Sequence, residues 1–310
     1  MDLQLILDEL SQDDLIYLFL PVFFLAMAIE YWYSKKQHLD LFDKDDTKAS
    51  LWMMLFTGIV DVLPKIVLFA AIYYLHEISP LRDVVLRQWW AWLLLLFLDD
   101  FIYYWFHRLN HQVRLMWAGH VNHHSAIKMN YGTALRQGVG ERIPKYLFWL
   151  PLPLLGFDAL MIFTMMSLNL FYQFWVHTEL VRRLPKPIEL IFNTPSHHRV
   201  HHASNVRYLD CNHAGIFIIW DRLFGSFSAE LDREPTNYGL TENLTSFKAM
   251  HVATHEYRAI WRDVKRADRW QDKLKYIFYA PGWSHDGPDK RSKTLRKALL
   301  AQEAAAAQSN

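Results

Sequence analysis

The stretch HRLNHQVRLMWAGHVNHH, residues 107–124, contains five of the 16 histidines of the chain. His107 and His111 are four residues apart, and His120, His123 and His124 follow the spacing 0, 3, 4. Residues three or four apart lie on one face of a helix, with about 5–6 Å between their Cβ atoms. Each of these two histidine boxes can therefore aim its imidazoles at one point.

A third box lies downstream in the stretch HRVHH, residues 198–202. It repeats the spacing 0, 3, 4 with His198, His201 and His202, and His197 directly precedes it. Eight imidazoles in three boxes are too many for one metal ion, so we expect two ions with open coordination positions. A single pair of histidines at this spacing is more often a surface or packing feature, but three boxes in one chain are poorly explained that way.

The composition limits the chemistry. The net charge of +1 argues against a nucleic-acid partner. Cys211 is the only cysteine, so neither an internal disulfide nor a metal site built on several thiolates can form. Imidazoles alone suit iron, copper, zinc or nickel.

The apolar residues, which make up 52% of the chain, gather in long runs of the kind that span membranes. A span needs about 20 helical residues to cross a core of about 30 Å. The run 146–176 is too long for one span and is broken by Pro151, Pro153 and Gly156, which predicts a helical hairpin, either two short spans or a re-entrant pair. We therefore predict an all-α integral membrane protein with about four to five transmembrane helices, from the runs 15–33, 51–75, 89–106 and 146–176.

The charges at the ends of these runs predict an orientation. Residues 1–14 are acidic and lack a basic segment, so we expect no cleaved signal peptide. Lysines and arginines gather on the side of the chain that carries the boxes, which favours a cytoplasmic location for that side. The N-terminus is then outside, and every histidine box is cytoplasmic, in a bacterial inner membrane or the endoplasmic reticulum.

The same reasoning divides one catalytic unit into three parts. We expect residues 1–180 to contain the transmembrane helices and the first two boxes. Residues 181–288 are expected to form a cytoplasmic cap with the last box, so that the cap covers a dimetal site. Residues 289–310, rich in lysine, arginine and then alanine, are expected to form a flexible tail.

The residues around the boxes extend the pattern well beyond the histidines. They include DFIYYWFH at 100–107, TALRQ at 133–137, QFWVHTE at 173–179, TPSHHRVHH at 194–202 and WDRLFGSF at 220–227. Over roughly residues 90–285 the chain resembles the fatty acid hydroxylase / sterol desaturase superfamily of integral-membrane diiron oxygenases. Within it, the alkylglycerol monooxygenase-like branch is the most similar.

The resemblance implies two iron ions, O2, a lipid substrate and an external electron donor. It also implies metal ligands at the eight box histidines, His107, His111, His120, His123, His124, His198, His201 and His202. His177 is implied as a further ligand, and His197 stands beside His198 as an alternative. Gln112 occupies the position where animal members of the branch have an acidic residue linked to pterin use, so a pterin is an open but unfavoured donor.

Asp100 is the main candidate for a supporting role. A carboxylate within an apolar run is costly and marks a functional hypothesis. It lies seven residues before His107, on the same helical face, so we expect it to accept a hydrogen bond from a ligand imidazole and fix its tautomer. Helix packing beside an arginine is the alternative. Glu179 and Asp221 are similar candidates.

Three further histidines are expected to lie outside the site. His213 is expected at the surface, although an approach to the metals is open. His251 and His255 are four residues apart and are expected on the face of a helix away from the boxes.

These observations predict an O2-dependent hydroxylation of a lipid C–H bond at two irons. A desaturase with the same metals is the near alternative, and a zinc-dependent membrane hydrolase or a metal-binding or transport protein is the distant one. No nucleotide-binding fingerprint such as GxGxxG is present, so electrons must come from a redox partner protein or a small reductant.

Overall fold

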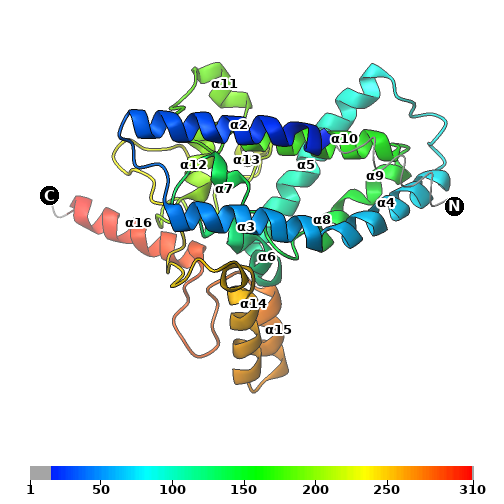
Figure 1. Cartoon of the computed structure of the whole chain (residues 1–310). Coiled ribbons are helices and arrows are strands. Elements are labelled where there is room, and N and C mark those ends of the chain that lie inside the picture. The colour runs from blue at the N-terminus through cyan, green and yellow to red at the C-terminus, as the bar shows by residue number, and fades with distance from the viewer. Residues whose placement is uncertain (1–14, 309–310) are drawn as a thin grey trace.

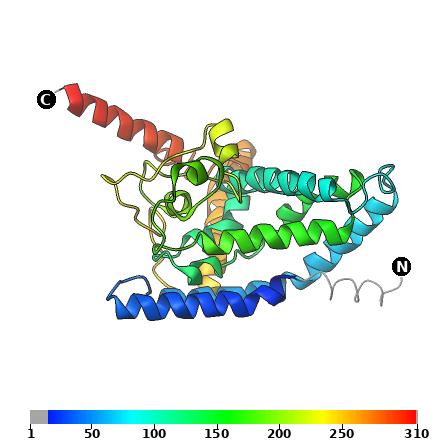
Figure 2. The same cartoon turned by 90° about the horizontal axis from the view of Figure 1, so that it is seen from above.

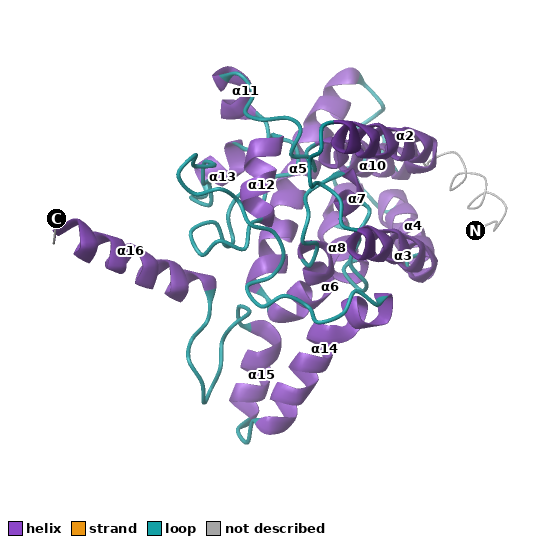
Figure 3. Ribbon diagram, turned by 60° about the vertical axis from the view of Figure 1, so that its left-hand side comes forward, coloured by secondary structure: helices purple, strands orange, loops and turns teal. Residues whose placement is uncertain are grey.

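A computed structural model describes residues 15–308 of the chain. These residues fold into helices joined by loops, and their only β pairing consists of isolated bridges (Figure 3). The prediction of an all-α fold is confirmed for this part of the chain. The acidic N-terminal segment, on which the absence of a signal peptide was predicted, lies outside the described residues.

The long helices form the body of the molecule. Helices α2 (Leu15–Lys36), α10 (Ala159–Trp175) and α5 (Trp89–Gln112) run side by side with α10 in the middle, as Figure 2 shows. Helices α3 (Lys44–Val60) and α4 (Val62–Glu77) run along a second layer (Figure 1). Buried apolar side chains such as Phe69, Phe106 and Trp149 form the core between α4, α5, α10 and the short α8 (Arg142–Trp149).

Two of the apolar runs are divided into shorter helices, and only the division of the run 146–176 was predicted. Helices α3 and α4 meet at Asp61 with a bend of 48°. The hairpin run divides into α8, α9 (Pro151–Leu154) and α10. Between α9 and α10, Gly156 adopts φ +93°, and a Cβ there would lie 2.5 Å from the carbonyl oxygen of Leu81. Only glycine fits this close approach.

Taken one at a time, the helices of residues 15–308 are each too short or too polar to cross a membrane. The bent pair α3–α4 meets the requirement when its two halves are taken together, by length and composition only, and α10 is a shorter apolar helix.

Smaller helices complete the fold around the end of α5. Helices α6 (Arg114–His124), α7 (Tyr131–Ala134), α11 (Lys186–Ile191), α12 (Pro195–His202) and α13 (Ile219–Leu223) lie there. The hairpin of α14 (Ala249–Arg266) and α15 (Trp270–Phe278) packs against α6 and extends from the body (Figure 1).

The C-terminal segment differs from the expected flexible tail. Residues Ser292–Gln308 form helix α16, which points away from the body (Figure 1). Alanine and lysine are strong helix formers, so this composition suits a helix as well as a frayed end. The first turn of α16 contacts the loop after α12, where Ser292 hydrogen-bonds to Asp210 and Arg296 to Cys211.

Candidate metal centre

Nine buried histidines converge from four places in the chain. Helix α5 runs without a break through the first box, and the extended Val113 (φ −115°, ψ 114°) then turns the chain so that α6 packs back against α5. His177 follows the end of α10, and the short helix α12 supplies the third box. After the turn at the prolines and the glycine of the hairpin run, α10 returns so that its terminal His177 lies beside His123 of α6.

The nine imidazoles divide into two groups, and within each group the candidate ligand atoms lie within 4.8 Å of one another. The first group takes five histidines and the second takes four. Helices α6 and α12 each contribute to both groups, so neither group corresponds to a box. The first group is His107, His111, His120, His124 and His201, and the second group is His123, His177, His198 and His202.

The protonation of the second group favours a bound cation. Nδ1 of His123 lies 3.1 Å from the carbonyl oxygen of Arg136, and Nδ1 of His177 lies 2.7 Å from that of Gln173. A carbonyl only accepts, so each Nδ1 carries the proton and donates it. Burial lowers the pKa of His123 well below its usual range and that of His177 to about 4, so both rings are neutral.

Each Nε2 atom of this pair is therefore unprotonated and carries a lone pair. The two Nε2 atoms nevertheless lie 3.1 Å apart, and His198 Nε2 lies 2.9 Å from His177 Nε2. Lone pairs at this distance repel unless a cation lies between them. The donor set of neutral nitrogens therefore fits a metal ion, of the kinds that imidazole prefers.

The first group has the same character. His107 Nδ1 donates to the carbonyl oxygen of His213 at 2.8 Å, which leaves its Nε2 as a lone pair. That Nε2 lies 3.0 Å from Nε2 of His120. The Nε2 atoms of His111 and His201 are buried and have no hydrogen-bond partner among the described residues. A buried polar atom without a partner is costly, and a metal ion would remove that cost.

The loop 210–213 positions three histidines of the first group. Its backbone carbonyls at Cys211 and His213 accept from Nδ1 of His201 (3.0 Å) and His107. Its Asp210 carboxylate lies 3.2 Å from Nδ1 of His111. Asp210 and Asn212 adopt φ 52° and 57°, a left-handed conformation that Asp and Asn tolerate better than most residues.

Asp100 supports this loop instead of a histidine. Its carboxylate accepts from the backbone N–H groups of Ile216 (2.6 Å) and Phe217 (2.9 Å) and from the indole of Trp220 (2.9 Å). The predicted hydrogen bond to a ligand imidazole is therefore wrong for Asp100. The carboxylate points along α5 toward the chain after His213, whose backbone N–H groups need acceptors when buried.

Asp221 has the parallel role at the other end of the segment. It accepts from the backbone N–H groups of His213 and Ala214, each at 2.8 Å, and from Ser226 at 2.6 Å. Asp100 and Asp221 together hold the backbone whose carbonyl orients His107. Both are positioning residues that act through this loop.

Other predicted residues lie at or outside the margin of the two groups. His197 is outside both, with its Nε2 3.0 Å from Glu189 and its ring edge-on to Phe227. Glu179 is half-buried and outside both groups; burial raises the pKa of its carboxyl, with Arg199 acting in the opposite direction. His251 and His255 lie on α14, apart from both groups.

The expected surface location of His213 is wrong. Its side chain is 1% exposed, and its ring centroid lies 5.1 Å from that of His111 and 5.8 Å from that of His107. The spacing of histidines could not reveal this approach, because the loop that brings it in is held by Asp100 and Asp221 from outside the boxes.

Sequence reasoning missed Glu141 and gave Arg136 no specific role. The Glu141 carboxylate lies 3.2 Å from Nδ1 of His120 and accepts from the amide of Asn110 at 3.0 Å. Burial raises the pKa of Glu141, but His120 and Arg142 outweigh it and hold the pKa below its usual range. Arg136 is fully buried, donates to Asp46 from α3, and thereby fixes the carbonyl that accepts from His123. An acidic residue at the start of an apolar run was the only signal for Glu141.

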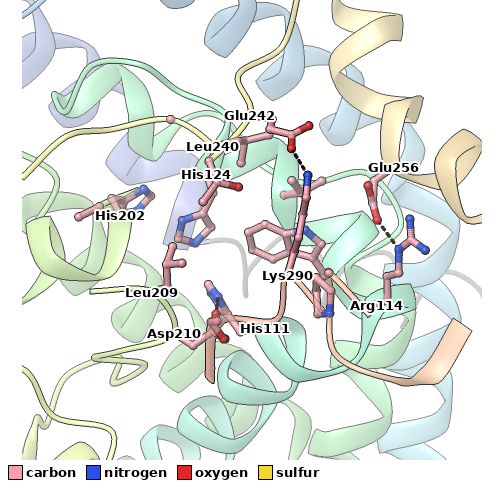
Figure 4. A pocket seen from close by; sticks show the side chains of 18 of the residues that line it. His111, Arg114, His124, His202, Leu209, Asp210, Leu240, Glu242, Glu256 and Lys290 are labelled. Atoms are coloured by element: carbon pink, nitrogen blue, oxygen red, sulfur yellow. Dashed lines mark hydrogen bonds and ion pairs between the residues drawn. The ribbon is translucent and has the colours of Figure 1, made fainter. Parts of the chain in front are cut away.

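Two cavities reach the histidines from different sides. A cavity of about 360 Å³ with charged residues at its rim, the polar cavity, ends on His111, His124 and His201 of the first group and on His202 of the second. Figure 4 shows its rim, where the ion pairs Lys290–Glu242 and Arg114–Glu256 lie near Asp210 and His111. A more apolar cavity of about 470 Å³ lies between α2, α3, α4 and α10 and ends on His120, His123 and His177.

Comparisons with known proteins agree with this geometry. Residues 92–226, which include both groups, match the family model described as fatty acid hydroxylase. This part of the chain is similar to that family. The resemblance inferred from the motifs is thereby confirmed. No solved structure matches the chain.

Curated relatives point to the same family. Alkylglycerol monooxygenase of Homo sapiens is 40% identical over 238 residues, which are 75% of this chain and 52% of that protein. The Xenopus tropicalis enzyme of the same name is 38% identical over 271 residues, 86% of this chain and 58% of that protein. An ornithine lipid hydroxylase of Rhizobium tropici is 30% identical over 155 residues, 47% of this chain and 44% of that protein. The chain thus spans just over half the length of the alkylglycerol monooxygenases that it matches.

Proposed function

We propose that this protein is a membrane-bound oxygenase that hydroxylates a C–H bond of a lipid with O2, at two iron ions held by the nine buried histidines. The observation that carries the proposal is the pair of neutral imidazoles His123 and His177. Their Nε2 lone pairs face each other at 3.1 Å at the inner end of a largely apolar cavity. A metal site beside an apolar cavity suits chemistry on a hydrocarbon chain.

The residues of the chain would bind and orient the lipid, hold the irons and enclose the site. The apolar side chains of α2, α3 and α10 that line the cavity, such as Phe23, Met54 and Phe174, would hold the acyl or alkyl chain and exclude water. The first and second groups would each hold one iron, and the bound irons would supply the activation of O2. Insertion of one oxygen atom into C–H and reduction of the other to water needs two electrons and two protons, which an external reductant must supply.

Exposed apolar stripes support the membrane location. On the bent pair α3–α4, Leu55, Ile59, Leu63 and Val67 are spaced four residues apart and are 53–75% exposed. On α2, Val22, Leu25, Ile29 and Trp32 form a similar stripe. Contiguous exposed apolar surface of this kind marks contact with a lipid or protein partner. We propose that these stripes face the lipid, with the histidine groups on the cytoplasmic side.

The names of the relatives support a hydroxylated lipid as the product. They carry the words alkylglycerol monooxygenase and ornithine lipid hydroxylase. These activities belong to those proteins, and we propose only the shared class, an O2-dependent hydroxylation of a lipid. Desaturation with the same metals is the second candidate, because removal of a second hydrogen would need the same site.

The test uses detergent-purified protein, wild type beside His123→Ala, with His251→Ala as a control from outside both groups. We expect about two iron ions per chain, as two-metal sites hold, and lipid-dependent O2 uptake with a reductant. His123→Ala should lose metal and uptake, and His251→Ala should keep both. Zinc alone, with no O2 uptake after reconstitution with iron, would refute the proposal in favour of a hydrolase or a metal-binding protein. The product, an alcohol or an alkene, separates hydroxylation from desaturation.

A further inference from the structure

The apolar cavity is lined by a buried lysine whose ammonium has no hydrogen bond or ion pair within the described residues. Its lining includes three basic side chains, Lys65, Arg142 and Lys145, and two acidic ones, Asp61 and Glu141. Positive charge is therefore in excess, although the cavity is the proposed site of a lipid chain. The question is which of the basic groups a ligand could use.

Arg142 and both acidic groups are already engaged. Arg142 Nε lies 3.0 Å from the Asp61 carboxylate. Glu141 faces His120 and accepts from Asn110. Asp99, the remaining carboxylate that acts on Lys145 electrostatically, accepts from the indole of Trp149 at 2.7 Å and from Asn169 at 2.9 Å. The nearby carboxylates thus have other partners.

Lys145 differs from these groups. Its side chain is 9% exposed and lines the cavity, yet its ammonium has no hydrogen bond or ion pair within residues 15–308. The ammonium lies 5.8 Å from the ring centroid of Tyr103 and 5.4 Å from that of Trp149. Burial and the nearby Arg142 lower the pKa of Lys145 to about 8, so most of it is still charged at pH 7. An ammonium has three donors, and leaving them unused in a buried place is costly.

We propose that Lys145 binds an anionic oxygen of the lipid's polar head, a carboxylate or a phosphate, inside the apolar cavity. The inference rests on the proposed function, since it takes this cavity as the lipid site. The ligand would supply the acceptor that the protein does not. The rings of Tyr103 and Trp149 lie beside the ammonium at the cavity, so the charge needs little rearrangement on binding.

The test is direct binding of three lipids with the same saturated chain to the metal-free protein, by displacement of a fluorescent lipid. The lipids are a fatty acid, a lysophosphatidate and a neutral monoacylglycerol. Lys145→Met should weaken the binding of an anionic lipid by about tenfold or more, as expected for a lost partner of a buried charge. The neutral lipid should change by less than about twofold, because Met keeps the contacts of the stem. Lys145→Arg should restore the preference, and the exposed Lys293→Met should leave it unchanged.

Each outcome either supports the anion site at Lys145 or overturns it. A loss for the fatty acid alone assigns the site to carboxylates, a loss for the lysophosphatidate alone assigns it to phosphates, and a loss for both assigns it to either anion. An equal loss of affinity for all three lipids, or no loss for any of them, overturns the proposal. The thermal midpoint of Lys145→Met should not fall, and a lower midpoint with equal losses would indicate a structural lysine. O2 uptake is measured separately in the iron-loaded protein. Absence of uptake with an intact binding preference would reject the proposed function and keep the anion site.

Discussion

The two histidine groups are supported in different ways. Behind the first group stand two carboxylates, Glu141 at His120 and Asp210 at His111, each 3.2 Å from an Nδ1 atom. Behind the second group the acceptors at His123 and His177 are backbone carbonyls. A carboxylate behind a ligating imidazole raises its basicity more than a neutral carbonyl does. His120 and His111 of the first group would therefore be the more strongly donating ligands of a bound metal.

Access to the two groups differs as well. The polar cavity with its ion pairs reaches three histidines of the first group and His202 of the second, whereas the apolar cavity reaches His123 and His177 of the second group and His120 of the first. From this difference we predict that the lipid enters by the apolar cavity, beside the second group, and that polar reactants enter by the polar cavity, beside the first. The following predictions test that difference, from the largest expected effect to the smallest.

Removal of a ligand from either group should have the largest effect. His111→Ala removes a first-group ligand, and His202→Ala removes a second-group ligand. Each should lower the metal content by about one ion per chain and turnover by more than about 100-fold, since even the residues behind a ligand contribute 10–100-fold. Elemental analysis and O2 uptake measure both effects.

The control is His197→Ala, a buried histidine of α12 that pairs with Glu189 outside both groups. It should retain both ions. Loss of both ions from each single ligand variant would show that the groups bind metal as one cluster, and the comparison of two separate sites would then fail.

Removal of the charge behind His120 should weaken the first group selectively. Glu141→Gln keeps the size of the side chain and the contact to Asn110 but removes the negative charge. We expect metal affinity at the first group to fall by about 10–100-fold, with the second group unchanged. Timed removal of metal by a chelator should show one fast and one slow ion. If both ions leave at the same rate in this variant, the carboxylate does not distinguish the groups.

Blocking each cavity in turn should separate the two routes. Leu170 lines the apolar cavity and Leu240 the polar one. Leu170→Trp should raise KM for a long-chain lipid by about tenfold, because added volume in an apolar pocket is poorly tolerated. Leu240→Trp should leave the KM of the lipid unchanged and raise that of a small polar reductant. The reverse pattern would mean that the lipid enters by the polar cavity.

Much of the site could be predicted from the sequence, because helical spacing depends only on local geometry. Imidazoles at 0, 3, 4 on α6 and α12 had to share a face, and the structure brings all eight box histidines and His177 together. The expectation that each box aims at one point is correct for the box on α5 but wrong for the boxes on α6 and α12, which are divided between the two groups. This division could not be predicted, because it depends on how α6 packs against α5 and α12, so that His123 joins His198 while its neighbour His124 joins His201.

The supporting residues were harder to predict for the same reason. Asp100 was correctly singled out as a buried carboxylate on α5, but its partner depends on where the loop after His213 folds. Glu141 acts on a histidine 21 positions away in the chain, and Asp210 acts on one 99 positions away. No local pattern encodes such pairings. The helix break at Gly156 was predictable, since proline and glycine act locally, whereas the bend at Asp61 was not predicted.

The smallest predicted effect concerns α16, which the sequence assigned to a flexible tail. The hydroxyl of Ser292 donates to the Asp210 carboxylate, whose other oxygen faces His111. Ser292→Ala removes one partly buried hydrogen bond to a charged group, worth about 1.5–3 kcal/mol at most in its direct contact. Only part of this free energy should affect metal binding, because Asp210 lies between Ser292 and His111. We therefore expect metal affinity at the first group to fall by about two- to tenfold, less than for a residue directly behind a ligand.

Metal affinity at the second group should not change in this variant, because the carbonyls that accept from His177 and His123 lie on α10 and at Arg136, away from α16. The matched control is Ser284→Ala, which removes a hydroxyl in the loop before α16 that bonds to Asp286. Chelator competition on the two variants and the wild type measures the effect. An unchanged first group in Ser292→Ala would show that Asp210 holds His111 without α16, and would limit the support of that group to the loop 210–213.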